Sequence, residues 1–393
     1  MSDTSVRDEA AQGSLWADAE WRAVIAAFAL NGLLFGAWAA RVPAFKEGFA
    51  LDPGTLGLLL LGLAGGAIAA FPLAGALSER WGAQILTWRC ALGYAPALVL
   101  LALAPTPLML GLTLAFFGAM HGAMDVAMNG WGAQVETRTK RSTMSVFHAV
   151  FSFGAGLGAA SGFAAVQMGL GPLEHFSAVA LIGGVVCLAV MYKSPSSIET
   201  KAQATSGPLF AFPRGPLLLV GLIAFSASMG EGAMADWSAV FLRLASAATE
   251  AQAALGYAVF SVAMVLTRLC GGLLVDRFGA VATVRTSMAT AVLGLSIAIL
   301  SQSVTFVLAG FALTGIGYAV VMPLVFSRAA RDPKIASGPA IASVATLGYG
   351  GMLLGPPVIG FVAQITGMRM SFAVLAVLAL LATALAGKMR VES

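Results

Sequence analysis

The sequence predicts an all-α polytopic membrane protein with twelve transmembrane helices in two six-helix bundles and both termini in the cytoplasm. Three observations predict this fold: an apolar composition, twelve apolar segments of spanning length, and a repeat that relates the two halves. Of the 393 residues 59% are hydrophobic and only 10% charged, and the mean hydropathy is +0.89. Soluble domains carry about 25% charged residues, so most of this chain is expected to lie in lipid.

A helix of about 20 apolar residues crosses a hydrocarbon core of about 30 Å. The predicted spans are 20–43, 54–77, 84–104, 107–132, 142–168, 174–192, 215–243, 251–275, 281–301, 303–327, 338–365 and 369–388. The polar segment 193–214 separates two bundles, 20–192 and 215–388, and is predicted to be a cytoplasmic linker. Residues 1–19 and 389–393 are predicted to be cytoplasmic tails.

The distribution of basic residues sets the predicted orientation. Of the 22 Lys and Arg, 16 fall in segments on the same side as the N-terminus, and Arg89 and Arg268 lie within spans. Only Arg41, Lys46, Arg243 and Arg369 fall on the other side. Basic loops stay in the cytoplasm, so both termini are predicted to be cytoplasmic in the cell inner (plasma) membrane. The same bias explains the net charge of +4 without a nucleic-acid partner.

The two halves repeat at an offset of 197 residues. The segment GALSERWG (75–82) recurs as GLLVDRFG (272–279). The same offset relates four further pairs, Gly118 and Gly315, Gly154 and Gly351, Gly158 and Gly355, and Gln167 and Gln364. Five matches at one register indicate duplication, and paired six-helix repeats suit a transporter in which two bundles rock about a central site.

The two copies of Gly-x-x-x-(Asp/Glu)-Arg-x-Gly resemble the signature loop of the major facilitator superfamily. The resemblance implies that family's fold and transport by alternating access, without ATP hydrolysis. Glu79–Arg80 and Asp276–Arg277 would latch neighbouring helix ends in one conformation. Alternatively, these charges only cap helices and obey the positive-inside rule.

Two shorter segments narrow the resemblance. MDVAMN (124–129) and VPAFK (42–46) resemble the fucose permease-like proton symporters. The second protonatable acid of that group would fall near Ala39 here, so the sequence departs from the group at that position.

Span 107–132 carries His121, Asp125 and Asn129 at intervals of four residues, which places them on one helical face. Burial disfavours the charged form of a carboxylate, so an acid in a partly dehydrated cavity can load and release a proton. We expect Asp125 to couple protons, and Asn129 and His121 to contact the solute. Alternatively, Asp125 is a structural acid held by a neighbouring cation or hydroxyl, and His121 is satisfied by a backbone carbonyl. His148, at similar depth, is a candidate partner of Asp125.

Span 215–243 contains Glu231 near its middle and Asp236 nearer its outer end. We expect Glu231 to be a second proton-coupling acid, in place of the acid missing from the first span. Asp236 and Arg41 lie at comparable depth on opposite bundles and could pair as an outer gate. Independent extension of both side chains to the outer surface is the alternative.

The predicted solute pocket combines polar anchors with aromatic walls, as small-molecule sites often do. Its members besides His121, Asn129 and Glu231 are Asn31, Trp38, Trp237, Tyr318 and Met322. The tryptophans could instead belong to the interfacial belt. Arg268 is expected to neutralise Asp276 or another acid at the inner end as part of the gate. Gly154, Gly158 and Gly162 are expected to let a neighbouring helix approach closely.

Catalytic chemistry is not predicted. The sequence has no phosphate-binding loop, no nucleophile motif, and only three histidines and three cysteines without paired spacing. We therefore expect a non-enzymatic, monomeric transporter without metal or cofactor, most simply a proton-coupled symporter of a small polar solute such as a sugar. The alternatives are a proton-linked exporter of amphipathic compounds, and a receptor or scaffold built on a transporter fold.

Overall fold

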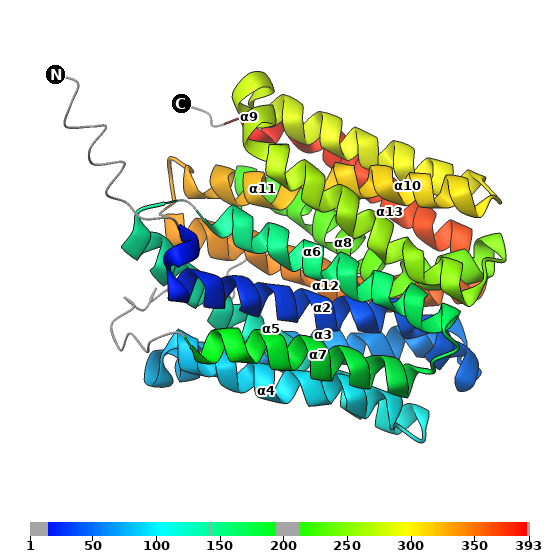
Figure 1. Ribbon diagram of the computed structural model, residues 1–393. Coiled ribbons are helices and arrows are strands. Elements are labelled where there is room, and N and C mark those ends of the chain that lie inside the picture. Colours follow the sequence, from blue (N-terminus) through cyan, green and yellow to red (C-terminus); the bar gives the residue numbers. More distant parts are fainter. Residues whose placement is uncertain (1–14, 142, 194–212, 336, 391–393) are drawn as a thin grey trace.

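The computed structural model describes residues 15–141, 143–193, 213–335 and 337–390, and the regular elements in these ranges are helices (Figure 1). Residues 1–14 of the predicted N-terminal tail, 194–212 of the linker and 391–393 of the C-terminal tail lie outside the described residues.

The first half of the chain forms a short 3-10 helix, η1 (Leu15–Ala17), and six long helices. These are α2 (Ala19–Gly48), α3 (Pro53–Trp81), α4 (Ala83–Ala102), α5 (Pro107–Thr139), α6 (Met144–Gln167) and α7 (Pro172–Tyr192). Side chains set several starts, because a short polar side chain can accept hydrogen bonds from the first helical amides. Asp18, Asp52 and Thr106 cap α2, α3 and α5 in this way.

The second half forms α8 (Pro216–Ser246), α9 (Glu250–Leu300), α10 (Val304–Tyr318), α11 (Val321–Ala330), α12 (Ser337–Thr366), α13 (Met368–Leu385) and η2 (Ala386–Met389). The 51-residue α9 covers two predicted spans, and Gly279 between them is non-helical with φ 74° and ψ 160°. Glycine adopts this positive φ without strain. The described residues hold 11 helices long and apolar enough to span a membrane, with α9 counted once. The count of twelve stays a prediction.

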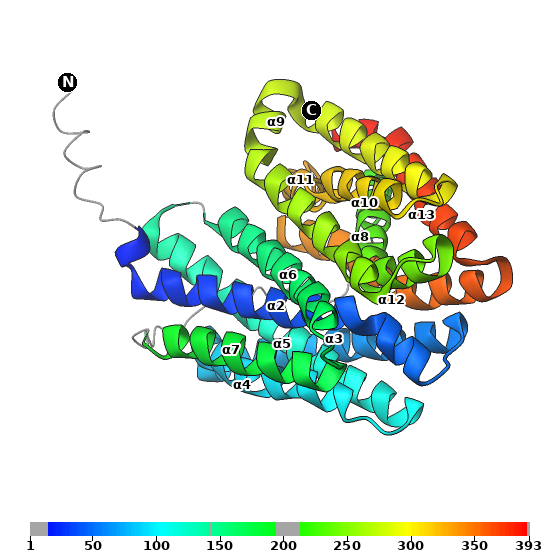
Figure 2. The ribbon, with the colours of Figure 1, turned by 45° about the vertical axis from the view of Figure 1, so that its right-hand side comes forward.

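Figure 2 shows α2–α7 on one side of the molecule and α8–α13 on the other. The two sides meet where α6 packs against α9, α3 against α12, and α2 against both α8 and α9. Residues 15 and 390 lie at one end of the helices, here called the terminal end (Figure 1). The loops after α2, α6 and α8 lie at the opposite end, here called the distal end.

Glycines bring α6 against α2. A Cβ on Gly154 or Gly158 would overlap the carbonyl oxygens of Ala29 or Leu33, and a Cβ on Gly162 would lie 2.6 Å from that of Ala40. The predicted close approach at these three glycines is confirmed.

The packing repeats between halves, with one change of register. Gly118 meets the Leu63 carbonyl and Gly315 meets the Phe260 carbonyl, and both pairs of partners lie 197 residues apart. Gly154 meets the Ala29 carbonyl, whereas its counterpart Gly351 meets that of Phe225, 196 residues further on. Helices α2 and α8 are therefore related by 196 residues.

The predicted span 303–327 is broken between α10 and α11. A helical carbonyl at Ala319 would bond to the amide of residue 323, but Pro323 has no N–H. Helix α10 ends at Tyr318 and α11 begins at Val321. The break leaves the Ala319 carbonyl available to another donor.

Candidate functional site

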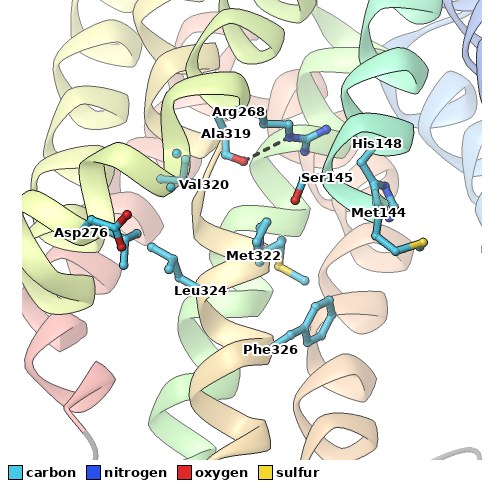
Figure 3. Close-up of a pocket in the computed structure, with 14 residues that line it drawn as sticks. Met144, Ser145, His148, Arg268, Asp276, Ala319, Val320, Met322, Leu324 and Phe326 are labelled. Atoms are coloured by element: carbon cyan, nitrogen blue, oxygen red, sulfur yellow. Dashed lines mark hydrogen bonds between the residues drawn. The ribbon is translucent and has the colours of Figure 1, made fainter. Parts of the chain in front are cut away.

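A cavity of about 490 Å³ lies between α6, α9 and the α10–α11 break, toward the terminal end. Figure 3 shows its walls: Met144 and His148 on α6, Arg268 and Asp276 on α9, and Met322 and Phe326 on α11. The carboxylate of Glu136 receives the amide N–H groups of Thr143 and Met144 at 2.7 and 2.8 Å. This cap fixes the start of α6 at the edge of the cavity.

Arg268 joins three elements at the cavity wall. Its Nε donates to the Ala319 carbonyl at 3.1 Å, which fills the acceptor that Pro323 leaves free. Its Nη1 donates to Ser152 Oγ on α6 at 2.6 Å, across the interface between the two sides of the molecule. Its Nη2 lies 3.3 Å from Glu231 Oε1 on α8. The side chains of Arg268 and Glu231 are 14% and 29% exposed, so water can reach the pair.

The acidic partner of Arg268 was predicted to be Asp276 or another inner-end acid. The structure instead pairs it with Glu231, which lies near the middle of α8. Asp276 lies two turns further along α9, at the cavity (Figure 3). Two turns of helix separate residues by roughly 12 Å, which is too far for an ion pair. Ser152, four residues after His148 on the same face, was missed although that spacing could have shown it.

Asp125 and Asn129 form a local pair on α5. The Asn129 amide donates to the Asp125 carbonyl at 2.9 Å and to Asp125 Oδ1 at 3.1 Å. Among the residues that the structure describes, no Lys, Arg or His forms an ion pair with Asp125. Both side chains are partly exposed, although neither belongs to the cavity wall. The alternative in which a neighbouring cation holds Asp125 as a structural acid is therefore not what the structure shows.

His121 is held inside the first half of the chain. Its Nδ1 lies 3.0 Å from the Tyr94 hydroxyl on α4, and its ring stacks on Phe35 at a centroid distance of 5.0 Å. The fully buried Asn31 donates to the His121 carbonyl at 3.4 Å. Asn31 and His121 are therefore in contact, and their binding of a solute stays a prediction. Tyr94 is the partner that sequence reasoning missed, because no pattern marks it out.

His148, the predicted partner of Asp125, lies in the cavity wall instead. Its ring stands edge-on to Phe28 at 5.4 Å, and Figure 3 places it beside the guanidinium of Arg268.

Seven of the eight predicted pocket residues do not line the cavity, namely Asn31, Trp38, His121, Asn129, Glu231, Trp237 and Tyr318. Trp38 and Trp237 are 0% exposed and Tyr318 is 1% exposed. Trp38 packs between Phe45 and Phe117, and a Cβ on Gly230 would overlap the Tyr318 ring. The prediction that these rings face a solute was wrong for this conformation, because close helix packing fills their surroundings. Met322 does line the cavity.

The distal end is held by ion pairs between the two sides of the molecule. Arg41 Nη1 lies 3.6 Å from Glu250 Oε1, and Arg41 Nη2 donates to the Leu170 carbonyl at 3.0 Å. Arg243 Nε binds Glu47 Oε1 at 2.7 Å.

The predicted Arg41–Asp236 pair is absent from the described residues. Asp236 is buried, and its Oδ1 has no hydrogen-bond partner in that part of the chain. Glu250 takes its place as the acid beside Arg41, and it stands just before the predicted span 251–275. Glu250, which lies outside the predicted spans, was not singled out from the sequence.

The four charges of the signature loops lie at the terminal end. Glu79, Arg80, Asp276 and Arg277 are exposed, and within the described ranges none of them forms an ion pair. Their role as a latch stays a prediction. No cluster of three or more His, Cys, Asp and Glu that could hold a metal occurs in residues 15–141, 143–193, 213–335 and 337–390.

Comparison with known proteins agrees with this architecture. Residues 218–392 match the family described as the Major Facilitator Superfamily. The chain is 43% identical to an uncharacterized transporter, y4wD, of Sinorhizobium fredii, over 93% of this chain and 97% of that protein. It is 36% identical to an uncharacterized MFS-type transporter of Yersinia pestis, over 90% of this chain and 91% of that protein.

A crystal structure of a mutant of the nucleoside transporter NupG shares the fold. Its TM-score is 0.76 at 15% sequence identity, with 95% of this chain and 100% of that chain covered. Together, the helical architecture and the two relatives show that this chain is a multi-pass membrane transporter, not an enzyme, and that it belongs to the Major Facilitator Superfamily.

Proposed function

We propose that the protein is a proton-coupled symporter that imports a small polar solute, such as a sugar or sugar-like metabolite. The bundles 20–192 and 215–388, twelve spans in all, would alternate between two openings as a monomer in the cell inner membrane. Both termini would be cytoplasmic. The likeness of residues 124–129 and 42–46 to fucose permease-like symporters supports this reading.

The conformation supports alternating access. With the terminal end in the cytoplasm, the cavity beside Arg268 opens inward, and the pairs Arg41–Glu250 and Glu47–Arg243 close the outer end. The structure is then an inward-facing state. An outward-facing state requires both pairs to break, and the loop charges at Glu79–Arg80 and Asp276–Arg277 are the candidates to hold the inner end closed in that state.

The unpaired carboxylate of Asp125 is the observation that carries the proposal. An ionised side chain in the membrane interior costs about 2.5–3.5 kcal/mol on insertion scales unless a partner or water compensates it. Asn129 supplies one hydrogen bond to the carboxylate, and no cation in the described residues neutralises it. A bound proton would neutralise the carboxylate without a cation. Asp125 would therefore take up and release the coupling proton, while the Asn129 carbonyl oxygen stays available to the solute.

Glu231 would be the second coupling acid. Its pairing with Arg268 ties α8 to α9, and Arg268 in turn reaches Ser152 on the other bundle. A proton on Glu231 removes the negative charge that holds Arg268. Protonation of Glu231 would therefore weaken the placement of Arg268 and alter its contact with Ser152 between the bundles.

Solute-dependent proton movement in proteoliposomes tests the proposal. Purified protein is challenged with a panel of sugars, amino acids and organic acids while a trapped dye reports the internal pH. We expect one class of solute to carry protons inward, and the Asp125→Asn variant to lose this signal. Glu174→Gln, which alters an exposed acid in the first turn of α7, should retain it. Equal proton movement in wild type and in Asp125→Asn would contradict the assignment of Asp125 as the proton-coupling residue.

The cavity wall gives one reason to keep the export alternative. Met144, Met322, Leu324 and Phe326 make much of it apolar, as a site for amphipathic compounds would be. A proton-linked exporter should raise the tolerance of cells to such compounds when it is expressed, and an importer should not.

A further inference from the structure

We infer that the solute carries a carboxylate group, and that this group binds Arg268 in the cavity while Glu231 takes up a proton. The inference rests on the proposed symport function and names the chemical class of the solute at the same site. It follows from the donors of Arg268, from the charges around the pair, and from the lining of the cavity.

Arg268 has donors to spare at the cavity. A guanidinium carries five N–H groups, and three of them serve Ala319, Ser152 and Glu231. The remaining N–H on each of Nη1 and Nη2 has no partner among the described residues. Two adjacent guanidinium donors match the two oxygens of a carboxylate, which is the pairing for which arginine is preferred over lysine.

The hydrogen bonds already present hold the guanidinium in place. The Ala319 carbonyl, freed by Pro323, fixes Nε, and Ser152 fixes Nη1 from the opposite bundle. A preorganised donor pair loses little side-chain entropy when a ligand binds. Arg268 is therefore a built anion site in the wall of the cavity and not a mobile surface residue.

The charges around Arg268 explain why a proton must accompany the anion. Glu231 already neutralises Arg268, so a second carboxylate would leave the site with an excess negative charge at membrane depth. The other titratable groups near Glu231 are Tyr257 on α9 and Tyr318, which packs against Gly230. His148 and Asp276 lie in the cavity wall, and neither bonds to Glu231.

The binding step balances in charge and atoms. The solute enters as R–COO⁻, one proton moves from the aqueous phase to a Glu231 carboxylate oxygen, and the Arg268–Glu231 ion pair is replaced by an Arg268–solute pair. The net charge of the site is unchanged. The apolar remainder of the cavity, from Met322 to Phe326, suits a short carbon chain or the apolar face of a sugar ring.

Matched pairs of ligands that differ only in the carboxylate test the inference. Glucose is compared with glucuronate and benzyl alcohol with benzoate, by calorimetric titration of the purified full-length protein at pH 5.5 and pH 8. We expect a carboxylate member to bind about tenfold or more tighter than its neutral partner, because only the carboxylate can accept two charge-assisted hydrogen bonds from Arg268. Its affinity should be higher at pH 5.5, because the proposed binding step takes up a proton from the solution.

Three variants sharpen the result. Glu231→Gln keeps the shape, frees Arg268 and should tighten carboxylate binding while removing its dependence on pH. Arg268→Gln should abolish the preference for carboxylates. Arg268→Lys keeps the positive charge but lacks the two adjacent guanidinium donors, so it should retain only part of that preference. Glu174→Gln, which alters an exposed acid in the first turn of α7 away from the cavity, is the control and should bind as wild type does. The melting temperature of each variant is measured to show that it is folded.

The inference is overturned if the neutral partners bind as tightly as the acids, or if Glu231→Gln weakens carboxylate binding. It is also overturned if no carboxylate binds at either pH. Proton-linked uptake of a neutral sugar would then still support the symport function, whereas the absence of proton-linked uptake for every solute would count against symport itself.

Discussion

At the scale of single residues, Arg268 connects more of the molecule than any pattern around it indicates. It ties α9 to α8, to the α10–α11 break and to α6. Three hydrogen bonds to three elements make it both a positioning residue for Glu231 and a fixed donor toward the cavity.

This arrangement predicts unequal costs for removing the two partners of the ion pair. Arg268→Gln leaves the Glu231 carboxylate without its cation and also loosens the contacts at Ser152 and Ala319. We expect it to lower the free energy of unfolding by about 1–3 kcal/mol. Glu231→Gln keeps an acceptor for Arg268 and leaves the other two bonds intact, so its effect should be smaller. Thermal melting of both variants in detergent compares them, and the reverse order would contradict the assignment.

The residue types were easier to predict than their partners. Asp125, Asn129 and His121 share a helix, so their common face follows from spacing alone. The partners of Arg268 and Arg41 lie on other helices, and Glu231 and Glu250 could not be identified without knowing how those helices cross. Trp38 and Trp237 were expected in a pocket because aromatic rings suit one, but composition cannot tell a packed ring from one that faces a cavity.

At the scale of helices, α3 meets α12 through glycines near the distal end. A Cβ on Gly57 would lie 2.8 Å from the Pro356 carbonyl oxygen. A Cβ on Gly360 would lie 2.5 Å from the Pro53 carbonyl oxygen. Both contacts cross between the two sides of the molecule. The close approach of α3 and α12 seen in this structure therefore requires small residues there.

Two glycines on α3 provide a matched comparison. Gly57→Ala should destabilise the protein by about 1–3 kcal/mol, because overpacking forces the two helices apart. Gly65→Ala, with nothing within 4 Å of its Cβ, should stabilise it by about 0.5–1 kcal/mol through helix propensity. Melting temperatures compare the two variants.

The variants Gly57→Ala and Gly65→Ala also test whether the α3–α12 contact keeps the distal end closed. Labelling of a cysteine placed at Ser145 reports access to the cavity beside Arg268, in a background where the native cysteines are replaced by alanine. Gly57→Ala should reduce this labelling if it disfavours distal closure, and Gly65→Ala should leave it unchanged. Equal behaviour of the two variants would show that the α3–α12 contact does not limit the closed state.

The start of α3 predicts a dependence of stability on pH. Thr55 donates to Asp52 through its hydroxyl at 2.7 Å and through its amide at 2.9 Å. The hydroxyl bond first, and then the amide bonds, lower the pKa of Asp52 below its ordinary value. A lowered folded-state pKa means that the cap stabilises the protein fully above the unfolded-state pKa and is lost as the pH falls through the folded-state value.

Asp52→Ala should therefore lower the melting temperature at pH 7, and the gap to wild type should shrink below about pH 4. Thr106→Ala removes the corresponding neutral cap of α5 and should give a gap that does not change with pH. A constant gap for Asp52→Ala would contradict the role of its charge.

Helices as such were predictable, because length and hydropathy suffice to find them. The interruptions of the helices could be predicted only in part. Pro323 breaks the span 303–327 through a missing amide, and the sequence contains that proline. What could not be foreseen is that Arg268 would use the freed carbonyl. The one-residue change of register between α2 and α8 was likewise invisible, since the matching glycines lie on α6 and α12.

At the scale of the whole molecule, the distal end is closed by charge pairs and the terminal end holds a cavity. The pair Glu47–Arg243 is partly exposed, and pairs of this kind contribute about 0.2–1 kcal/mol. Such a modest contribution suits a contact that must break in every transport cycle.

Charge reversal at this pair should shift the conformational equilibrium. Glu47→Arg places like charges together and should favour the state that is open at the distal end. A cysteine at Ser238, which is fully buried here, should then react faster with a reagent added outside. The double variant Glu47→Arg with Arg243→Glu should return most of the way to the wild-type rate. Fast labelling in the double variant would show that the pair does not hold the distal end closed.

Proton coupling at Asp125 is the central claim, and a comparison of two transport modes in one set of proteoliposomes tests it most directly. The measurement follows uptake driven by a pH gradient and, without a gradient, exchange of labelled for unlabelled solute, in wild type and in Asp125→Asn. If Asp125 carries the coupling proton, the variant keeps exchange and loses gradient-driven accumulation, because an amide can bind solute but cannot release a proton. Accumulation that survives in Asp125→Asn at the wild-type level would contradict the account.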